Sequence, residues 1–527
     1  MFKFCKQYIN KFKVKMIIYL LLSMVTTIIA IITPVLWGRI IDIMVIRSNV
    51  NLLVKTGIIV SALGLFRIII NYINNKLYII IQTNSAMDIS ADVIQHLHKI
   101  SLSKIQEYDV GYLNESINHD SNSINIFFLS VLTGILSNGL LLIIPLFIMF
   151  GLQYKIALVL LIVIAGYIVL YLAFREKLVE KAKMFREAQS IFFAALLEQF
   201  KNVKFIKQHA LEEFYKERFR KAFQVFFRKA LLTQQFFFLY SSIDQVLEVI
   251  INFCIYVLGG IWVINGELTI GSFTIILNYY RNILSSIKYF ADLGKEYQNN
   301  NVSYQRLQTY FNLNEHTNGT KEVKHIIEME CKGLSFFREN NTILNSFDYI
   351  FKKGNIYCIQ GENGAGKTTL IDILIGLFID EYEGKILYNG IDIKDIDMNK
   401  QRYSNISVLE QNPYVLEGNA EENIYLTERH HENKYRDRIL DKELGNIYNN
   451  GNGISGGEKQ KLGILRMLAK DSDVMVLDEP TSALDQESRK SVFELLQEIK
   501  KEKIIIIISH DKEVDQFADY IINLSER

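Results

Sequence analysis

The stretch NIYCIQGENGAGKTTLIDILIGL, residues 355–377, has an apolar beginning, a glycine-rich centre and an apolar end. Its beginning is typical of a strand and its end of a helix. Between them, Gly361, Gly366, Lys367 and Thr368 match in full the pattern G-x-x-x-x-G-K-[ST] of a P-loop. The sequence therefore predicts an α/β domain that places a phosphate-binding loop between a strand and a helix.

The residue types in this loop suit a bound nucleotide. Glycines let backbone N–H groups close around the β-phosphate, and the N-terminus of the following helix favours its negative charge. Lys367 can reach the β- and γ-phosphates, and the Thr368 hydroxyl can ligate Mg²⁺. The residues expected to hold the nucleotide are Gly361, Glu362, Asn363, Gly364, Ala365, Gly366, Lys367, Thr368 and Thr369.

Two further stretches predict strands that end beside this loop. DVMVLDEP, residues 473–480, ends in Asp478, which would hold Mg²⁺, and Glu479, which could polarise the attacking water. The alternative is that these two acids cap a turn. KIIIIISH, residues 503–510, is typical of a fully buried parallel strand. This strand would bring His510 to the phosphates, although a single histidine is more often structural.

Long charge-free runs set the first 310 residues apart from this domain. Met16 to Gly38, Ser121 to Tyr154 and Ile156 to Phe174 have 23, 34 and 19 residues without a charge. A helix of about 20 residues crosses a bilayer core of about 30 Å. The short LQYK at 152–155 allows only a tight hairpin, so the runs on either side of it must cross in opposite directions.

Three weaker candidate spans carry charged residues: Arg67 in the first, Asp244 and Glu248 in the second, and Arg281 in the third. Two interpretations of these charges stay open. They could line a polar cavity that receives a substrate, or they could form ion pairs with one another or lie near the membrane surface. The six predicted spans are 16–38, 54–75, 125–153, 156–174, 233–264 and 268–290.

Basic residues predict the orientation of the spans. The segment 175–230 holds 14 Lys and Arg, and the first fifteen residues hold five, whereas the three expected outer loops hold only Arg47 and Lys155. Both termini and the P-loop domain are therefore expected in the cytoplasm, with the spans in the cell membrane. The long connectors, about 76–120 and 175–230, show helical spacing and should continue the spans as helices.

Composition excludes other classes of function. The net charge of +1 gives no support to a nucleic-acid partner. The four cysteines are scattered, without a C-x-x-C pattern, so neither a disulfide framework nor a cysteine metal site is expected.

Further motifs stand in a fixed order along the second half. Gln411 lies in SVLEQNPYVLEGNAEENI, ISGGE occupies 454–458, and SALD occupies 482–485. With GENGAGKTT, VMVLDE and His510, these motifs resemble the ATP-binding cassette (ABC) transporters. The stretches SLSKIQEYDVGYLNESINHDSNSI and GELTIGSFTIILNYYRNILSSIKYF are similar to the six-span exporter type. The resemblance covers essentially the whole chain.

The resemblance implies roles for several residues. Gln411 would sense Mg²⁺ and the γ-phosphate, and Asp485 would couple two sites across an interface. Ser455, Gly456 and Gly457 would bind the γ-phosphate of an ATP held by a second cassette. The implied catalytic residues are Glu479, His510 and Gln411, and the residues implied at Mg²⁺ are Thr368, Gln411 and Asp478.

Some positions depart from the family pattern. Ile454 and Glu458 flank Ser-Gly-Gly where the family usually has Leu and Gln, and Glu458 brings a negative charge near the neighbouring triphosphate. At the adenine-stacking position, usually an aromatic residue, the chain has Arg338 with Phe337 beside it, and either could stack. The stretch between the P-loop and Ser-Gly-Gly is also short, which predicts a trimmed helical subdomain.

The sequence thus predicts a half-transporter: an all-α six-helix transmembrane domain (1–311), a linker (312–324) and an α/β P-loop ATPase domain with a small helical subdomain (325–527). Two bound ATP would clamp two such chains, identical or related, and drive export by alternating access. The substrate is expected to be a peptide, with an amphipathic or lipid-like molecule as the alternative. An ATP-gated channel or sensor and an importer of the exporter-like fold stay open, whereas the uncharged runs exclude a soluble chromosome-maintenance ATPase.

Overall fold

The computed structural model of the chain describes residues 1–46, 49–316, 318–338, 341–426, 435–440, 454–511 and 513–524. It divides into two compact units. The helical unit comprises Met1–Gln95 and Val110–Asn312, and the sheet unit comprises His96–Asp109 and Leu313–Arg527.

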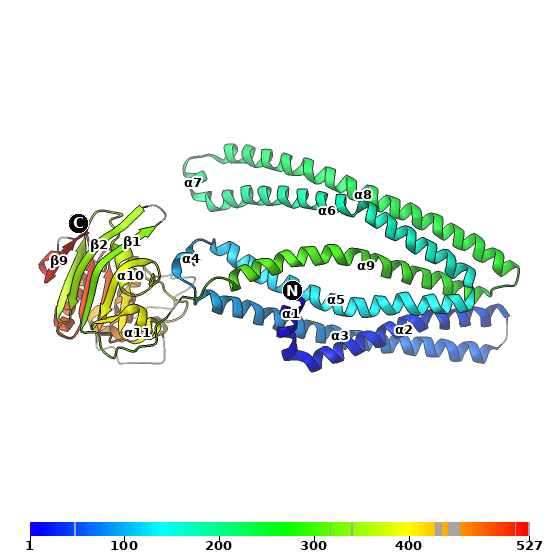
Figure 1. Cartoon of the computed structure of the whole chain (residues 1–527), viewed down its shortest axis with the longest axis horizontal. Coiled ribbons are helices and arrows are strands. Elements are labelled where there is room, and N and C mark those ends of the chain that lie inside the picture. The colour runs from blue at the N-terminus through cyan, green and yellow to red at the C-terminus, as the bar shows by residue number, and fades with distance from the viewer. Residues whose placement is uncertain are drawn as a thin grey trace. The chain divides into compact units, whose positions relative to one another are not determined.

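The helical unit is built from helices, most of them long (Figure 1). They are α1 (Phe2–Ile9), α2 (Lys13–Ile46), α3 (Val50–Leu97), α5 (Val110–Leu152), α6 (Tyr154–Lys201), α7 (Val203–Gln208), α8 (Glu212–Ile264) and α9 (Ile270–Phe311), with a 3₁₀ turn η1 (Asn10–Phe12) between α1 and α2. The break between α5 and α6 confirms the tight hairpin predicted at 152–155. The predicted connectors are also helical, because α3 continues 22 residues beyond the end of its predicted span at residue 75.

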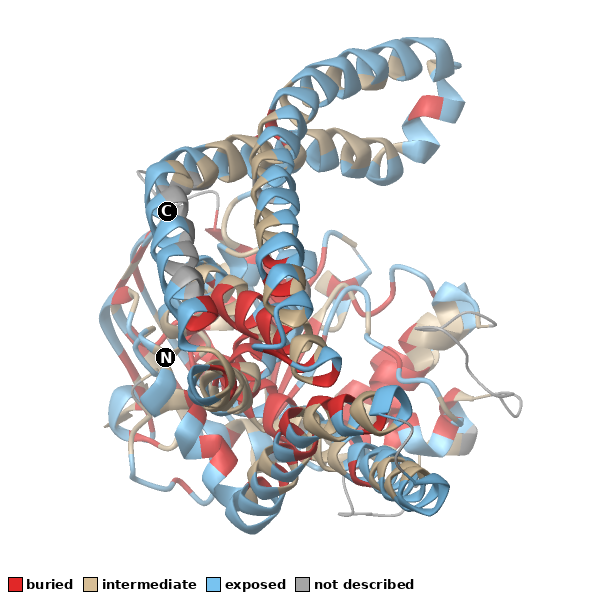
Figure 2. Cartoon of the chain, turned by 90° about the vertical axis from the view of Figure 1, so that its right-hand side faces the viewer, coloured by how far each residue is buried: buried red, intermediate tan, exposed pale blue. Residues whose placement is uncertain are grey.

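Several of these helices are apolar and long enough to cross a membrane. Within the described residues, α1 with α2, α3, α5 and α8 meet this condition by length and composition. Much of their surface is exposed (Figure 2), including large apolar side chains such as Ile68 and Phe147, as expected of helices that face lipid. The predicted spans 156–174 and 268–290 lie on α6 and α9 and stay predictions.

Helix α9 packs against α2 and α5, and α6 packs against α8. The buried Tyr279 hydroxyl of α9 donates to the Ile31 carbonyl of α2 at 2.7 Å. At the start of α9, the Gly271 N–H donates to the Asp42 carboxylate of α2 at 2.7 Å. These contacts fix α9 to α2 near the short loop that follows α8.

The structure gives a partner to one of the charged residues within the predicted spans. Glu248 of α8 pairs with Lys288 of α9 at 3.5 Å, so its partner is neither Arg67 nor Arg281. The side chain of Asp244 lies outside the described residues.

The sheet unit contains two sheets. Its strands are β1 (Glu328–Arg338), β2 (Asn341–Lys352), β3 (Asn355–Gln360), β4 (Tyr382–Tyr388), β5 (Ile391–Asp392), β6 (Ile406–Leu409), β7 (Val474–Asp478), β8 (Ile504–Ile508) and β9 (Tyr520–Asn523). An antiparallel sheet has the order β2-β1-β4-β5, and a parallel sheet has the order β6-β7-β8-β3-β9. All five residues of β8 are buried, which confirms the predicted buried parallel strand.

Helices cover both faces of the parallel sheet. They are α4 (Leu102–Gln106), α10 (Lys367–Leu374), α11 (Met398–Ser404), α12 (Ala420–Ile424), α13 (Arg436–Ile439), α14 (Gly456–Ala469) and α15 (Gln486–Ile499), with 3₁₀ turns η2 (Ile393–Asp395), η3 (Lys500–Glu502) and η4 (Val514–Gln516). Apolar residues of α10 join one core with the antiparallel sheet, and those of α14 and α15 join another with the parallel sheet. The stretch expected to form a trimmed helical subdomain lies partly outside the described residues.

The short helix α4 belongs to the sheet unit although its neighbours in sequence, α3 and α5, belong to the helical unit. Leu102 packs against the core around α10, and the Ser103 hydroxyl donates to the Glu381 carboxylate. Beside it, the His316 N–H of the linker donates to the Lys99 carbonyl at 2.7 Å. Helix α4 is therefore held on the sheet unit by apolar and polar contacts.

Candidate functional site

The predicted phosphate-binding loop joins β3 to α10, as expected. Gly364 and Gly366 have φ angles of 89° and 86°, a left-handed region that disfavours other residues. A Cβ on Gly366 would lie 2.8 Å from Cγ2 of Ile343, so the closeness of β2 also requires glycine there. The loop is thus shaped by residues without side chains, which leaves its backbone accessible.

Lys367 lies at the start of α10 and spans the loop. Its Nζ donates to the carbonyls of Gly361 at 2.8 Å and Glu362 at 3.0 Å. The ammonium group is therefore held at the concave side of the loop, where phosphate oxygens are expected.

Thr368 and Asp478 offer oxygen atoms to a cation. The Thr368 hydroxyl donates to the Asp478 carboxylate at 3.4 Å. Burial, and next the charge of Glu479, raise the pKa of Asp478. A hydroxyl and a carboxylate oxygen at this separation fit the hard-oxygen preference of Mg²⁺, and a cation would offset the cost of burying this charge.

A pocket of about 300 Å³ brings most of the predicted residues together. The site residues predicted from the sequence that line this pocket are Asn363, Gly364, Gly366, Lys367, Thr368, Thr369, Gln411, Asp478, Glu479 and His510. Gln411 and His510 thus reach the P-loop from β6 and β8, the strands that they follow. Ile343 and Ile508 complete the described lining.

Glu479 is held in an unusual backbone conformation directly after β7. Its φ of 47° is rare for a residue with a side chain, and such strain is concentrated at functional sites. The Glu479 N–H donates to the Ile508 carbonyl at 2.9 Å, and its carboxylate accepts from Gln411 Nε2 at 2.8 Å. Gln411 therefore orients Glu479 directly.

Gln460, which no sequence pattern marks, also supports Glu479. This buried side chain of α14 donates to the Glu479 carbonyl at 2.7 Å and accepts from the Ala483 N–H at 2.9 Å. It joins α14 to the turn after β7. Within a helix whose apolar face forms the core, a lone glutamine carries no pattern that marks this role.

Asp372 is a second residue that sequence reasoning missed. Burial in α10, followed by the charges of Asp478 and Glu410, raises its pKa to about 6. The negative charge of Asp478 at the cation site thus acts on an acid in the helix that follows the P-loop.

The glycine pair of ISGGE begins helix α14. Ser455 caps the helix, and the Glu458 carboxylate accepts from the Ser455 N–H at 2.7 Å, forming a capping box. A Cβ on Gly457 would lie 2.9 Å from the Ala483 carbonyl oxygen, whereas one on Gly456 would meet nothing closer than 3.7 Å. Close packing therefore requires the second glycine, and the first leaves open space.

Asp485 caps α15, where its carboxylate accepts from the Ser488 N–H at 2.8 Å. That hydrogen bond lowers the pKa of Asp485. The described lining of the P-loop pocket includes neither Asp485 nor the three residues 455–457.

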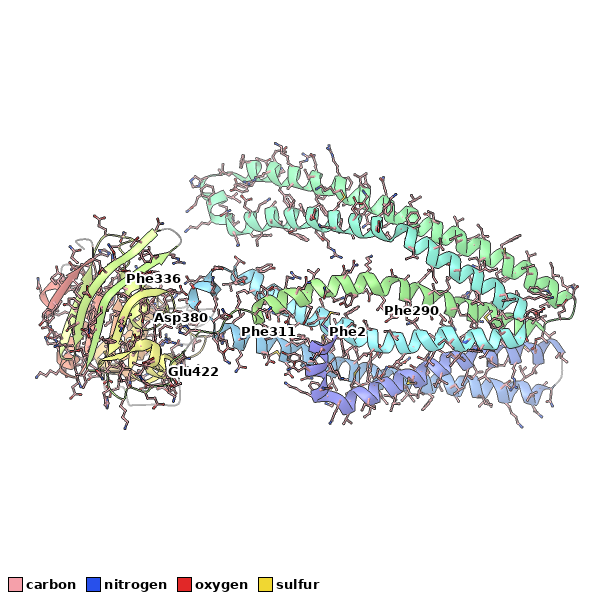
Figure 3. The ribbon with its side chains drawn as sticks, viewed as in Figure 1. Phe2, Phe290, Phe311, Phe336, Asp380 and Glu422 are labelled. Atoms are coloured by element: carbon pink, nitrogen blue, oxygen red, sulfur yellow. The ribbon has the colours of Figure 1, made fainter. Side chains whose placement is uncertain are left out.

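A hydrogen bond separates the two candidates for stacking on adenine. Phe336 is buried against Phe378 (Figure 3). The register of β1 against β2 shifts between Phe336 and Phe337, and both Phe337 and Arg338 are exposed. Arg338 Nη2 also donates to Gln106 Oε1 of α4 at 3.1 Å.

Two family models match the chain. The one described as ABC transporter transmembrane region covers residues 16–287, and the one described as ABC transporter covers residues 344–482.

Relatives match over most of their length. An ATP-dependent lipid A-core flippase of Haemophilus influenzae is 24% identical over 507 residues, covering 90% of this chain and 84% of the relative. The protein of the same name from Syntrophus aciditrophicus is 25% identical over 457 residues, covering 83% and 75%.

A solved structure shares the fold. A bacterial Atm1-family ABC exporter with ATP bound superposes with a TM-score of 0.78 at 18% identity, covering 98% of this chain and 94% of that one. The chain therefore belongs to the ABC transporters, as a multi-pass half-transporter of exporter fold whose ATPase domain couples ATP hydrolysis to transport.

Proposed function

We propose that this chain works as one half of a dimer that uses ATP and Mg²⁺ to export an amphipathic, lipid-like substrate. One observation on Ser455 to Gly457 carries the dimer. Ser455 to Gly457 begin α14, whose N-terminus favours an anion, yet they are absent from the described lining of the P-loop pocket. These three residues would instead bind the triphosphate of an ATP held by the P-loop of a second chain.

At each P-loop, the side chains divide the work of hydrolysis. Lys367 neutralises phosphate charge, and Thr368 with Asp478 would hold Mg²⁺, which supplies further charge neutralisation when bound. Glu479, oriented by Gln411, accepts a proton from the attacking water. His510 lines the same pocket, from which it would contact the phosphates.

We assign stacking on adenine to Arg338 rather than to Phe337. Nη2 of Arg338 donates to Gln106 Oε1 of α4 at 3.1 Å, which restrains its guanidinium group. A planar guanidinium stacks on an aromatic ring by cation–π attraction. The departure from the usual aromatic residue therefore keeps a flat platform for the base.

Helix α4 would transmit movement of the ATPase domain to the spans. It is fixed to the sheet unit by Leu102 and Ser103, yet it is continuous in sequence with α3 and α5. Displacing the sheet unit must therefore displace the ends of both long helices. This continuity supports alternating access driven by closure of two ATPase domains. The basic residues of the N-terminus and of 175–230 favour both termini in the cytoplasm.

The relatives favour a lipid-like substrate over the peptide expected from the sequence. The proteins from Haemophilus influenzae and Syntrophus aciditrophicus are named lipid A-core flippases. A substrate of that kind has acyl chains and a polar head group, which suits spans that are apolar apart from a few charges.

Reconstituted vesicles test this function. Vesicles with the ATPase domains outside would carry a fluorescent phospholipid in both leaflets, and dithionite would report the fraction left in the outer leaflet. We expect ATP to deplete the outer leaflet by moving the lipid inward, which corresponds to export from a cell. Glu479→Gln vesicles should show no ATP-dependent change.

The alternatives predict other results. An importer of exporter-like fold would enrich the outer leaflet instead. A gated channel or sensor would not move the lipid away from its even distribution, so the wild type, like Glu479→Gln, would show no ATP-dependent change. Either result would refute ATP-driven export.

A further inference from the structure

A side chain of α15 holds the loop that carries His510. Residues 482–485, the SALD turn, lie between β7 and α15, and His510 follows β8. Arg489 of α15 donates from Nε to the Leu484 carbonyl at 2.9 Å and from Nη1 to the Asp511 carboxylate at 3.3 Å. One guanidinium group therefore joins the SALD turn to the residue that directly follows His510.

Asp511 fixes the shape of the loop after β8. Its Oδ1 accepts from the Glu513 N–H at 3.0 Å, while its Oδ2 accepts from Arg489. The Asp511 N–H donates to the hydroxyl of the buried Ser509 at 3.0 Å. His510 lies between Ser509 and Asp511, so the backbone on both sides of it is restrained.

The beginning of the SALD turn is held by a different helix. Gln460 of α14 accepts from the Ala483 N–H at 2.9 Å and donates to the Ser482 hydroxyl at 3.4 Å. Arg489 holds the next residue of the turn, Leu484. The turn is thus fixed between α14, which begins at the Ser-Gly-Gly motif, and the loop that carries His510.

The ion pair of Arg489 with Asp511 is better suited to positioning than to stability. Water reaches both side chains, which are 32% and 30% exposed, and an ion pair at such a place adds little to the stability of a fold. The donors of a guanidinium group lie in a fixed planar fork, so two acceptors that it bridges are held in a set direction from each other. A displacement of Leu484 is therefore passed on to Asp511.

We propose that Arg489 is a positioning residue that couples the SALD turn to His510. This inference rests on the proposed function, in which Asp485 meets the second chain and His510 contacts the phosphates. The described lining of the P-loop pocket does not include Arg489, so it acts through Asp511. Closure of the second chain on the SALD turn would move Asp511, and with it His510, into the position that hydrolysis requires.

A double-mutant cycle tests this coupling. The full-length protein would be placed in nanodiscs, and kcat and KM for ATP measured for Arg489→Gln, for Asp511→Asn and for both changes together. Asp511→Asn keeps an oxygen for the Glu513 N–H but removes the charge that pairs with Arg489. We expect each single change to lower kcat about 10-fold, because a small misplacement near the phosphates is costly, and to leave KM within about 2-fold. The double variant should also lose about 10-fold rather than about 100-fold, because both changes break the same contact.

Matched variants separate positioning from structure. Arg489→Lys keeps the charge but not the fork, so we expect kcat to fall about 3-fold, and this variant also tests the proposal if Arg489→Gln does not fold. Lys490→Gln removes the next positive charge of α15, which pairs with Glu494 at 4.0 Å, and should behave as wild type. The midpoint of thermal unfolding should be nearly the same in all these variants, because an exposed ion pair adds little stability.

Three results would overturn the inference. A wild-type kcat in Arg489→Gln would show that the contact does not affect hydrolysis. A loss of about 100-fold in the double variant would show that Arg489 and Asp511 act independently. A fall in the unfolding midpoint that parallels the fall in kcat would show a structural role.

His510→Ala distinguishes a failure of this inference from a failure of the proposed function. We expect it to lower kcat at least as much as Arg489→Gln does, because Arg489 acts through the loop of His510. A wild-type kcat in His510→Ala would count against the proposed role of His510 itself. A slow His510→Ala beside a normal Arg489→Gln would overturn the coupling alone.

Discussion

The two units of this chain use polar residues differently. In the sheet unit, polar side chains converge, as at Glu479, which accepts from Gln411 and is supported by Gln460. In the helical unit, charged residues such as Arg67 and Arg281 are scattered along exposed faces of separate helices. Phosphate chemistry fixes residue types and spacing in the first case. In the second, a bilayer requires apolar composition, and only the exceptions carry information about a substrate.

The largest effect should come from the most convergent site. Glu479→Gln removes the base that accepts the proton of the attacking water, so we expect the steady-state ATPase rate to fall about 1,000-fold. The matched control is Glu487→Gln, an acid in the first turn of α15, which should keep the wild-type rate. A wild-type rate in Glu479→Gln would remove the contrast between the two units.

The next effect concerns the stability of the sheet unit. Burial raises the pKa of Asp372 to about 6. Its favourable contribution is therefore complete below about pH 4 and is lost as the pH rises through about 6. Asp372→Asn should be more stable than wild type by about 2 kcal/mol at pH 8, with little difference at pH 4.

Urea unfolding of the full-length protein in EDTA at several pH values measures this difference. Glu383→Gln, at an exposed position on β4, provides the control. An advantage of Asp372→Asn that does not grow between pH 4 and pH 8 would refute the electrostatic explanation.

A smaller effect distinguishes Arg338 from Phe337. Arg338→Ala should raise the KM for ATP about 10-fold, because loss of a stacking partner costs about 1 to 2 kcal/mol. Phe337→Ala should change it less than about 2-fold, and Arg338→Tyr should restore most of the affinity. If Phe337→Ala has the larger effect, the base stacks on Phe337 instead.

The smallest effect is expected at Glu458. Its carboxylate is turned back onto the Ser455 N–H, a contact that glutamine can also make. Glu458→Gln should therefore change the ATPase rate less than about 2-fold, whereas Glu458→Ala should destabilise the helix start by about 1 kcal/mol. A large gain in turnover with glutamine would show that the negative charge acts on the neighbouring triphosphate.

The sequence predicted elements whose residue types are dictated locally. Five consecutive isoleucines predicted β8, and the four residues LQYK predicted the hairpin between α5 and α6. The P-loop pattern predicted a pocket that the structure forms with Gln411, Asp478, Glu479 and His510 in its lining.

Contacts between distant segments could not be predicted in the same way. The pairing of Glu248 with Lys288 depends on how α8 and α9 pack, and hydropathy does not report helix rotation. Gly457 looks like a poor helix residue until the Ala483 carbonyl is placed beside it. The attachment of α4 to the sheet unit likewise depends on tertiary contacts, such as that between Ser103 and Glu381.

ATP trapping by mixed dimers tests the central claim, that each site takes its P-loop from one chain and its Ser-Gly-Gly motif from the other. Both chains would carry Glu479→Gln to prevent turnover; one would add Lys367→Ala and the other Ser455→Arg, with different affinity tags to isolate the mixed dimer. We predict about one trapped ATP per mixed dimer and none in either parent dimer, because the mixed dimer keeps one intact pair of motifs. The same absence of trapped ATP in the mixed dimer would contradict the shared site.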